Sequence, residues 1–336
     1  MSVLVYSFVF AGCALASWWG CKRLIDWLQA AAVLDIPNHR SLHGLPVPRG
    51  AGLAIAMVVL LAQCGLALSG VVQWRETLVL LAAGAGFAAL GWADDRGSKP
   101  VLLRLIAQFV IAGGCVLGLA FPLLNNMISM VVAGVAIAAL VWHVNLFNFM
   151  DGADGFAAAQ AIMVAFGLAI LLANHGDVGL ALWAVAIAGA TAGFLRWNWS
   201  PARIFLGDSG SYFLGFELAV LIYAARLAGV GLAAMIILLA PFVVDATLTL
   251  LGRMLSGRTW WQAHRSHAYQ LLVLRGWSPS RLALTLATSI GLVGWPLSWL
   301  AAYSTHSSVI AVFAYALTGI MWGTIRWTAE ANPAQP

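Results

Sequence analysis

Long apolar stretches separated by short polar segments dominate the chain and define its predicted elements. Eleven of them reach or approach the length of about 20 apolar residues that crosses a bilayer. Each stretch is continuously apolar, whereas membrane β-strands alternate over about ten residues, so we predict helices. The expected spans are roughly 3–22, 51–70, 76–93, 101–121, 127–144, 156–173, 178–195, 210–225, 229–251, 282–303 and 308–325.

The composition supports lipid as the main solvent of the chain. Hydrophobic residues make up 62% and charged residues only 9%, whereas soluble domains carry about a quarter charged residues. This excludes a soluble secreted protein, a disordered chain and a disulfide scaffold. We therefore predict an all-α, polytopic integral membrane protein with about 10–11 transmembrane helices. Residues 1–326 would form a single transmembrane domain with cytoplasmic loops, and 327–336 a short cytoplasmic tail.

The distribution of cations predicts the orientation, because Lys and Arg accumulate on the cytoplasmic side. With these spans, Arg75 and Arg226 lie on one side and the other fifteen Lys and Arg residues, Arg40 among them, on the opposite side. The first cation, Lys22, follows the first apolar stretch, which favours a retained helix over a cleaved signal peptide. We expect a periplasmic N-terminus and a cytoplasmic C-terminus.

Five polar segments from distant parts of the chain fall on this cation-rich side. They hold Asp35, Asp94, Asp95, Asp151, Asp154 and Asp208, and Asp245 lies just inside the ninth predicted helix. Short loops of a membrane protein need not be so charged, so we predict one shared site. The segments are Asp35–Arg49, Trp92–Arg104, Asn145–Gly155, Arg196–Ser211 and Arg253–Arg281.

One of these segments carries amides and carboxylates at intervals of three: Asn145, Asn148, Asp151 and Asp154. On a helical or 3₁₀ turn this spacing forms one stripe. Carboxylates so arranged repel one another unless a cation lies between them. A cap at the start of the sixth helix would explain Asp154 alone, so the whole row favours a ligand or metal site.

The other segments each allow two interpretations. Asp94 and Asp95 end the third predicted helix, where they would form local ion pairs or serve Mg²⁺ or a general base. Asp208 sits in a Gly- and Ser-rich helix start, either as its cap or with a metal and phosphate. His264 and His267 are spaced for zinc, but without further ligands nearby, phosphate contact is favoured.

Taken together, these motifs resemble the polyprenyl-phosphate N-acetylhexosamine-1-phosphate transferases, the superfamily that includes phospho-N-acetylmuramoyl-pentapeptide transferase. The resemblance covers about residues 35–270, and its His264–Gln270 run is most similar to enzymes that start O-antigen synthesis. It rests on Asp35-Ile-Pro-Asn-His-Arg40 with Pro48-Arg49-Gly50, Asp94-Asp95, Asn148-Phe-Met-Asp151-Gly-Ala-Asp154-Gly, Phe205-Leu-Gly-Asp208-Ser-Gly-Ser211 and His264-Arg-Ser-His267.

The resemblance implies a bacterial inner-membrane enzyme that moves a sugar-1-phosphate from a UDP-N-acetylhexosamine to undecaprenyl phosphate and releases UMP. Mg²⁺ would be required, with Mn²⁺ as the alternative ion. The implied metal ligands are Asp208 and Asp94. The implied catalytic residues are Asp94 and Asp95, which would activate the lipid phosphate or assist the metal, and Asn148 and Asp151, which would order the site. The implied substrate-binding residues are Phe205, Asp154 and Gly152 for uracil, His264, Arg265 and His267 for the diphosphate, and Arg49, Lys99 and Arg104.

Direct attack and an aspartyl-phosphate intermediate are both compatible with this sequence. A membrane prenyltransferase is one alternative function, although its acids are spaced four apart rather than three. A nucleotide-sugar or lipid carrier is another, but Glu217 and Asp245 are nearly the only acids within spans, where a polar pathway would need more. The expected partners are the two substrates and the bilayer, without nucleic acid, and a homodimer is left open.

Overall fold

The computed structural model describes residues 2–37, 46–258 and 264–331. Arg40 and residues 332–336 of the expected tail lie outside the described residues. Residues 327–331 continue the last helix, so the helix extends into the segment expected as a tail.

The first part of the chain contains α1 (Val3–Ala30), β1 (Leu34–Asp35), β2 (Val47–Pro48), α2 (Gly52–Leu68), α3 (Trp74–Asp95), α4 (Val101–Ala120), η1 (Phe121–Leu123), α5 (Met127–Phe149), α6 (Phe156–His175), α7 (Val178–Asn198) and α8 (Gly207–Leu227). The remainder contains α9 (Leu232–Ile236), η2 (Ile237–Leu239), α10 (Ala240–Leu255), α11 (Ala268–Leu274), α12 (Pro279–Ser289), η3 (Ile290–Gly294), α13 (Trp295–Tyr303) and α14 (Ser307–Ala331).

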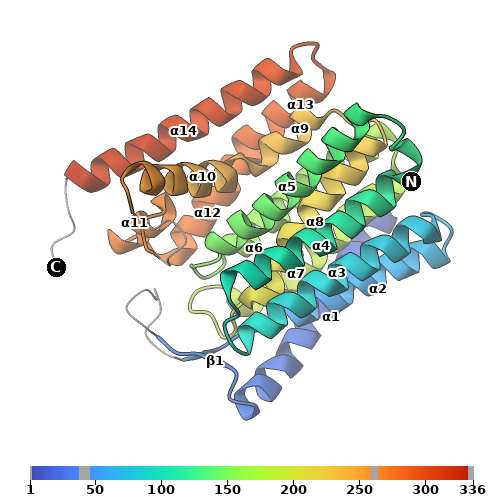
Figure 1. Ribbon diagram of the computed structural model, residues 1–336. Helices are drawn as coiled ribbons and strands as arrows, with labels where there is room; N and C mark the ends of the chain where they lie inside the picture. Colours follow the sequence, from blue (N-terminus) through green and yellow to red (C-terminus); the bar gives the residue numbers. More distant parts are fainter. Residues whose placement is uncertain (1, 38–45, 259–263, 332–336) are drawn as a thin grey trace.

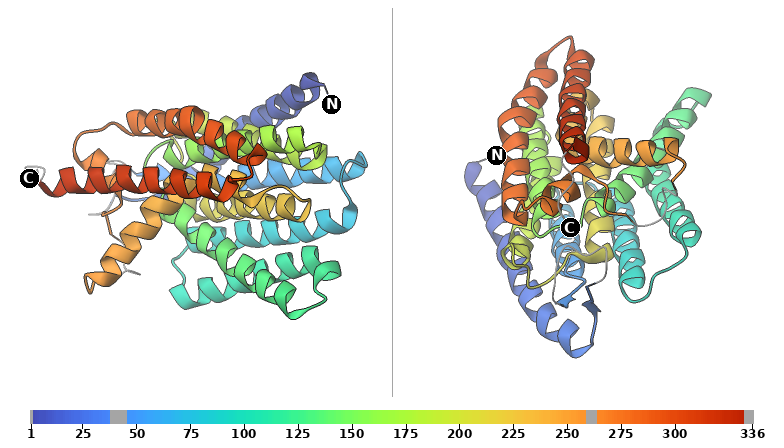
Figure 2. Two further views of the ribbon diagram at one scale, coloured as in Figure 1. Left: turned by 90° about the horizontal axis from the view of Figure 1, so that it is seen from above. Right: turned by 90° about the vertical axis from the view of Figure 1, so that its left-hand side faces the viewer.

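The fold is the predicted all-α membrane bundle. Within the described residues, ten helical segments are long and apolar enough to cross a bilayer. The remaining predicted span, 51–70, corresponds to α2, whose 17 residues lie at the short end of the range for transmembrane helices. α1 begins at one end of the bundle and α14 ends at the other (Figures 1 and 2), as an odd number of crossings requires.

Two predicted spans are interrupted rather than continuous. The ninth is built from α9, η2 and α10, and the tenth from α12, a π-helical turn and α13. Pro241 and Pro296 lie in the first turn of α10 and α13. Proline lacks the backbone N–H that continues the helical ladder, which accounts for helix breaks at these places.

The core lies around α6, α7 and α8, which are buried over most of their length, whereas α1 and α14 expose most of theirs. Phe147, Phe213, Phe216 and Phe242 fill the interior. Large apolar side chains such as Leu4, Phe8 and Ile128 point outward, where lipid would surround them. Figure 2 shows α1 and α14 at the periphery of the bundle.

The helix ends that carry the polar motifs meet at one end of the bundle. The last residues of α3 and α5 and the first of α8 lie together, because α8 packs along both helices. A Cβ at Gly91 would lie 2.1 Å from the carbonyl oxygen of Asp208, so only glycine allows α3 to approach the start of α8 this closely. The short β1–β2 pair, which the sequence did not predict, lies at this same end (Figure 1).

Candidate active site

The start of α8 is held by the carboxylate of Asp95. The backbone N–H groups of Asp208 and Ser209 donate to its Oδ1 and Oδ2 over 2.7 and 2.9 Å, and the Asp95 side chain is fully buried. A helix N-terminus has unpaired N–H groups and a positive dipole end, so a carboxylate stabilises it. Gly207 precedes this turn with φ +75°, and a Cβ there would lie 2.7 Å from Asp95 Oδ2.

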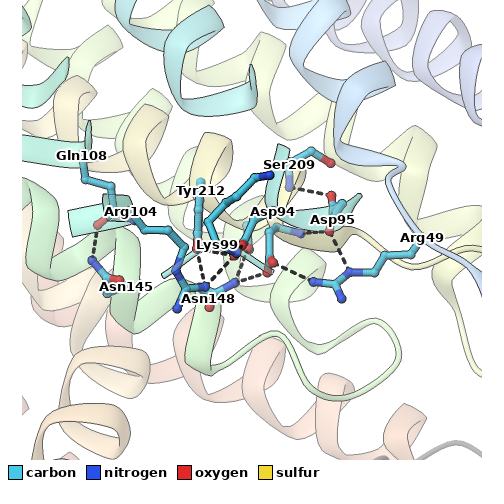
Figure 3. A network of polar contacts seen from close by, with 12 residues as sticks. Arg49, Asp94, Asp95, Lys99, Arg104, Gln108, Asn145, Asn148, Ser209 and Tyr212 are labelled. Carbon is cyan, nitrogen blue, oxygen red and sulfur yellow. Dashed lines mark hydrogen bonds and ion pairs between the residues drawn. The ribbon is translucent and has the colours of Figure 1, made fainter. Parts of the chain in front are cut away.

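Arg49 joins Asp95 to Asp208. Its Nε lies 2.7 Å from Asp95 Oδ1, and its Nη2 lies 2.8 Å from Asp208 Oδ2 (Figure 3). Burial works against the charge of Arg49, but the facing carboxylates outweigh burial and raise the pKa of Arg49 above its usual range. Arg49 is therefore a permanent cation between two acids from different helices.

The segment after α7 holds Arg49 in place through the backbone. The N–H of Phe205 donates to the carbonyl oxygen of Pro48 over 2.8 Å, and the N–H of Gly50 donates to that of Phe205 over 3.2 Å. Phe205 itself is half-buried. The Pro48-Arg49-Gly50 and Phe205–Ser211 motifs are thus one structural unit.

Asn148, in the last turn of α5, completes the hydrogen bonding of Asp208. Its Nδ2 donates to Asp208 Oδ1 over 2.7 Å and to Ser211 Oγ over 2.8 Å. The side chain of Asp208 is 15% exposed, so a ligand can still reach the carboxylate.

Asp94 has partners different from those of Asp95. Its carboxylate accepts hydrogen bonds from the backbone N–H of Lys99 over 2.6 Å, from Arg104 Nη1 over 2.5 Å and from the Tyr212 hydroxyl over 3.3 Å. Figure 3 shows this group beside Asn148. The side chain of Lys99 is exposed. The sequence motifs did not identify Tyr212 as a residue of the site, although it lies one helical turn after Asp208.

Asp151 is the acid of this region with the fewest internal partners. It is half-buried, and its carboxylate makes no hydrogen bond within the described part of the chain. Burial, followed by the nearby carboxylates of Asp208 and Asp95, raises the pKa of Asp151 well above its usual value, against the opposing effect of Arg49. Asp151 therefore lies within electrostatic reach of the Arg49 cluster and is available to a ligand.

The charges of the site are unbalanced in a way that suits a divalent cation. Four carboxylates face the two guanidinium groups of Arg49 and Arg104. Over the described residues, no three His, Cys, Asp or Glu side chains form a ready metal cage. Mg²⁺ often takes only one or two carboxylates and completes its shell with water and substrate phosphates, so this donor set fits such an ion. The four acids are Asp94, Asp95, Asp151 and Asp208.

The Asp151–Gly155 turn is tied to the segment that follows α7. Asp154 Oδ2 accepts the backbone N–H of Ala202 over 3.0 Å, and the N–H of Gly155 donates to Asn198 Oδ1 over 2.9 Å. Gly152 is exposed. The structure therefore brings Asp154 to the segment that contains Phe205, whereas Gly152 faces Tyr269 of α11. A uracil-binding role for both stays a prediction.

The His264–His267 segment lies beside the site, and its members differ in accessibility. His267 is buried, with its ring stacked against Phe149 and 4.9 Å from that of His264, whereas Arg265 is exposed. Burial and the neighbouring cations lower the pKa of His264 to about 4, so at neutral pH it is uncharged. Contact of all three with a diphosphate stays a prediction, and Arg265 is the accessible cation.

Asp245 of α10 caps the short helix α11, a role the sequence did not predict. Its Oδ1 accepts the backbone N–H of Ala268 over 2.8 Å, and its Oδ2 accepts that of Tyr269 over 3.1 Å. The Tyr269 hydroxyl in turn donates to the carbonyl oxygen of Phe149 over 3.1 Å. Asp245 thus holds α11 against the turn that contains Asp151.

Replacing Asp245 with Ala is expected to destabilise the protein by about 1–3 kcal/mol, because two buried N–H groups lose their acceptor. The measurement is the thermal unfolding temperature of the detergent-solubilised protein. Asp245→Asn, which keeps one acceptor oxygen, should lose less. An unfolding temperature equal to that of the wild type in Asp245→Ala would show that the cap contributes nothing.

Known proteins resemble this chain in its sequence. The Glycosyl transferase family 4 profile matches residues 77–226. A decaprenyl-phosphate N-acetylglucosaminephosphotransferase of Mycobacterium leprae is 31% identical over 309 residues, covering 80% of this chain and 76% of the relative. A probable undecaprenyl-phosphate N-acetylglucosaminyl 1-phosphate transferase of Bacillus subtilis is 25% identical, covering 77% and 75%. A phospho-N-acetylmuramoyl-pentapeptide-transferase of Clostridium perfringens is 29% identical, covering 62% and 69%.

Proposed function

Because the chain belongs to glycosyl transferase family 4, we propose that it transfers an N-acetylhexosamine-1-phosphate from a UDP-sugar to undecaprenyl phosphate. The products are undecaprenyl-diphospho-sugar and UMP. The observation that carries the proposal is the cluster of Arg49, Asp95, Asn148 and Asp208 at one end of a membrane bundle. The relatives' names, which specify sugar-phosphate transfer to polyprenyl phosphates, favour an enzyme over a carrier.

The reaction suits a site built mainly to bring anions together. One phosphoanhydride bond breaks and another forms, so the main obstacle is repulsion between the lipid phosphate and the diphosphate of the donor. Cations that contact the phosphates offset this repulsion as charge spreads in the transition state. Arg49 is placed and charged for this role, and Arg104, Lys99 and Arg265 are the further candidates.

Mg²⁺ is the proposed cofactor, with Mn²⁺ as the alternative. When bound, the ion would neutralise phosphate oxygens and polarise the bond that breaks. Asp208 is the proposed ligand because its carboxylate is reachable while Arg49 and Asn148 fix its orientation. Asp94 was the expected second ligand, but its side chain is only 2% exposed, against 15% for Asp208, and its carboxylate accepts hydrogen bonds from Lys99, Arg104 and Tyr212. Asp151, without such bonds, is therefore the stronger candidate.

Asp95 is proposed as a positioning residue rather than one that touches substrate. Both of its oxygens are engaged by α8 and Arg49, and its side chain is fully buried. The phosphate of the acceptor is already ionised near pH 7, so a base is not required to activate it. Direct attack and a covalent aspartyl intermediate both stay open, and Asp151 is the acid accessible for the latter.

The site is proposed to face the cytosol of a bacterial inner membrane. The UDP-sugar is soluble and cytosolic, whereas the acceptor phosphate is held at the bilayer surface, so the polar helix ends should lie at the cytosolic interface. The excess of cations at this end agrees with that orientation. The His264–Gln270 run supports a role in starting lipopolysaccharide O-antigen or a related glycan.

The proposal is tested by incubating the purified protein with undecaprenyl phosphate, Mg²⁺ and a panel of UDP-N-acetylhexosamines while following UMP. We expect UMP with at least one donor, dependent on both the acceptor and the metal. Omission of the lipid is the matched control, since simple hydrolysis of the donor would not need it. No UMP with any donor would contradict the enzyme and favour a carrier.

A further inference from the structure

Glu217 is a buried acid that the proposed reaction does not use. It lies near the middle of α8, nine residues after Asp208, which places it roughly 14 Å further along the helix. Its exposed fraction is 0%, and α8 is one of the spans that cross the membrane. An unpaired carboxylate in such surroundings is costly, so ionisable groups inside membranes have partners or lose their charge.

The partners of Glu217 are neutral. Gln63 Nε2 of α2 donates to its Oε2 over 3.0 Å, and Trp183 Nε1 of α7 donates to the same oxygen over 2.7 Å. On the side of α3 it faces Gly84, where a Cβ would lie 2.9 Å from Oε1. The Cys115 thiol of α4 is within electrostatic reach. Among the described residues, no Lys, Arg or His forms an ion pair with Glu217.

Two oxygens in this cluster lack a donor. Glu217 Oε1 and Gln63 Oε1 are both buried without a hydrogen-bond partner in the described structure. A buried acceptor without a donor costs about 1–3 kcal/mol, so two of them on hydrogen-bonded side chains require an explanation. The two oxygens belong to the two side chains that are already joined by the amide of Gln63.

We infer that Glu217 carries a proton on Oε1 and donates it to Gln63 Oε1, closing an acid–amide ring that fastens α2 to α8 inside the bilayer. One proton supplies a partner to both orphaned oxygens at once. It also removes the buried charge, and it leaves Oε2 as a carbonyl oxygen that accepts from Gln63 and Trp183. The proton is thus the ligand of this site.

The ring connects the helices that carry the candidate active site. α2 begins three residues after Arg49, α8 carries Asp208 in its first turn, and α3, which faces the ring at Gly84, ends in Asp95. The contact at Glu217 therefore sets the spacing of α2 and α8 below the Arg49–Asp208 ion pair. This role is independent of which donor or acceptor the enzyme uses.

Glu217→Gln tests the inference, because a carboxamide has the shape and neutral charge of the protonated acid and donates where the acid does. Infrared spectra of the detergent-solubilised protein should show the carbonyl stretching band of a protonated carboxyl group in the wild type and lose it in Glu217→Gln. The variant should fold and keep its basal activity. An unchanged band, or a variant that fails to fold, would overturn the inference.

The pH dependence of stability supplies a second readout. When an acid stays protonated in the folded protein but ionises on unfolding, the free energy of unfolding falls as the pH rises. The unfolding temperature of the wild type should therefore equal that of Glu217→Gln below about pH 4, where the glutamate of the unfolded chain is also protonated, and fall progressively below it as the pH rises. Gln63→Leu should lower the unfolding temperature and shift the carboxyl band. A variant Glu217→Gln that is less stable than the wild type at every pH would show that Glu217 is ionised.

Discussion

Asp208→Ala is expected to lower turnover by about 10³-fold or more, the scale of removing a group that stabilises charge in the transition state. Asp208 is the acid at which Arg49 and Asn148 converge, and it is the proposed metal ligand. The loss should be similar with Mg²⁺ and with Mn²⁺, because both ions would lose the same carboxylate ligand. The measurement is the initial rate of UMP release with both substrates saturating.

The structure indicates that this variant folds. Asp95 is bound by the backbone N–H of residue 208 rather than by its side chain, so the turn at the start of α8 survives in Asp208→Ala. An unfolding temperature close to that of the wild type should verify this. Glu76→Gln, an exposed acid in the first turn of α3 at the far end of the bundle, is the matched control and should keep full activity. Retained activity in Asp208→Ala would show that Asp208 is not the metal ligand.

The membrane fold could be predicted from the sequence because continuous apolar runs leave few alternatives. What the runs could not show is where a span is interrupted. The breaks before α10 and within the tenth span, and the formation of α11, depend on proline positions and on contacts such as the cap from Asp245. Such contacts join residues far apart in the chain, and the pattern of apolar residues along the chain does not predict them.

The convergence of the polar segments at one end of the bundle could also be predicted, but not the partners within it. Asp94 and Asp95 looked like a single pair, yet adjacent residues on a helix point about 100° apart. One reaches Arg104 and Tyr212, and the other reaches Arg49. Helical geometry could have predicted the divergence, whereas the identity of each partner depends on how α3 packs against α4 and α8.

Asp95→Asn is expected to destabilise the protein by about 2–4 kcal/mol, because Arg49 loses the negative charge it pairs with and a buried N–H donor is placed against other donors. Both oxygens of Asp95 accept hydrogen bonds, so in either orientation the asparagine NH₂ meets an N–H of Arg49, Asp208 or Ser209. Activity should fall as well, since the orientation of Asp208 depends on this turn. Thermal unfolding and UMP release measure the two effects.

A positioning role for Asp95 makes a prediction that a direct catalytic role does not, namely that stability and activity fall together. Gly207→Ala should lower both stability and activity without changing any charge of the site. The φ of +75° at Gly207 disfavours a side chain, and the added Cβ would lie too close to Asp95 Oδ2. Asp26→Asn, an exposed acid of α1, is the matched control and should behave as the wild type. If Asp95→Asn lost activity at unchanged stability, Asp95 would instead act on the substrate or the metal.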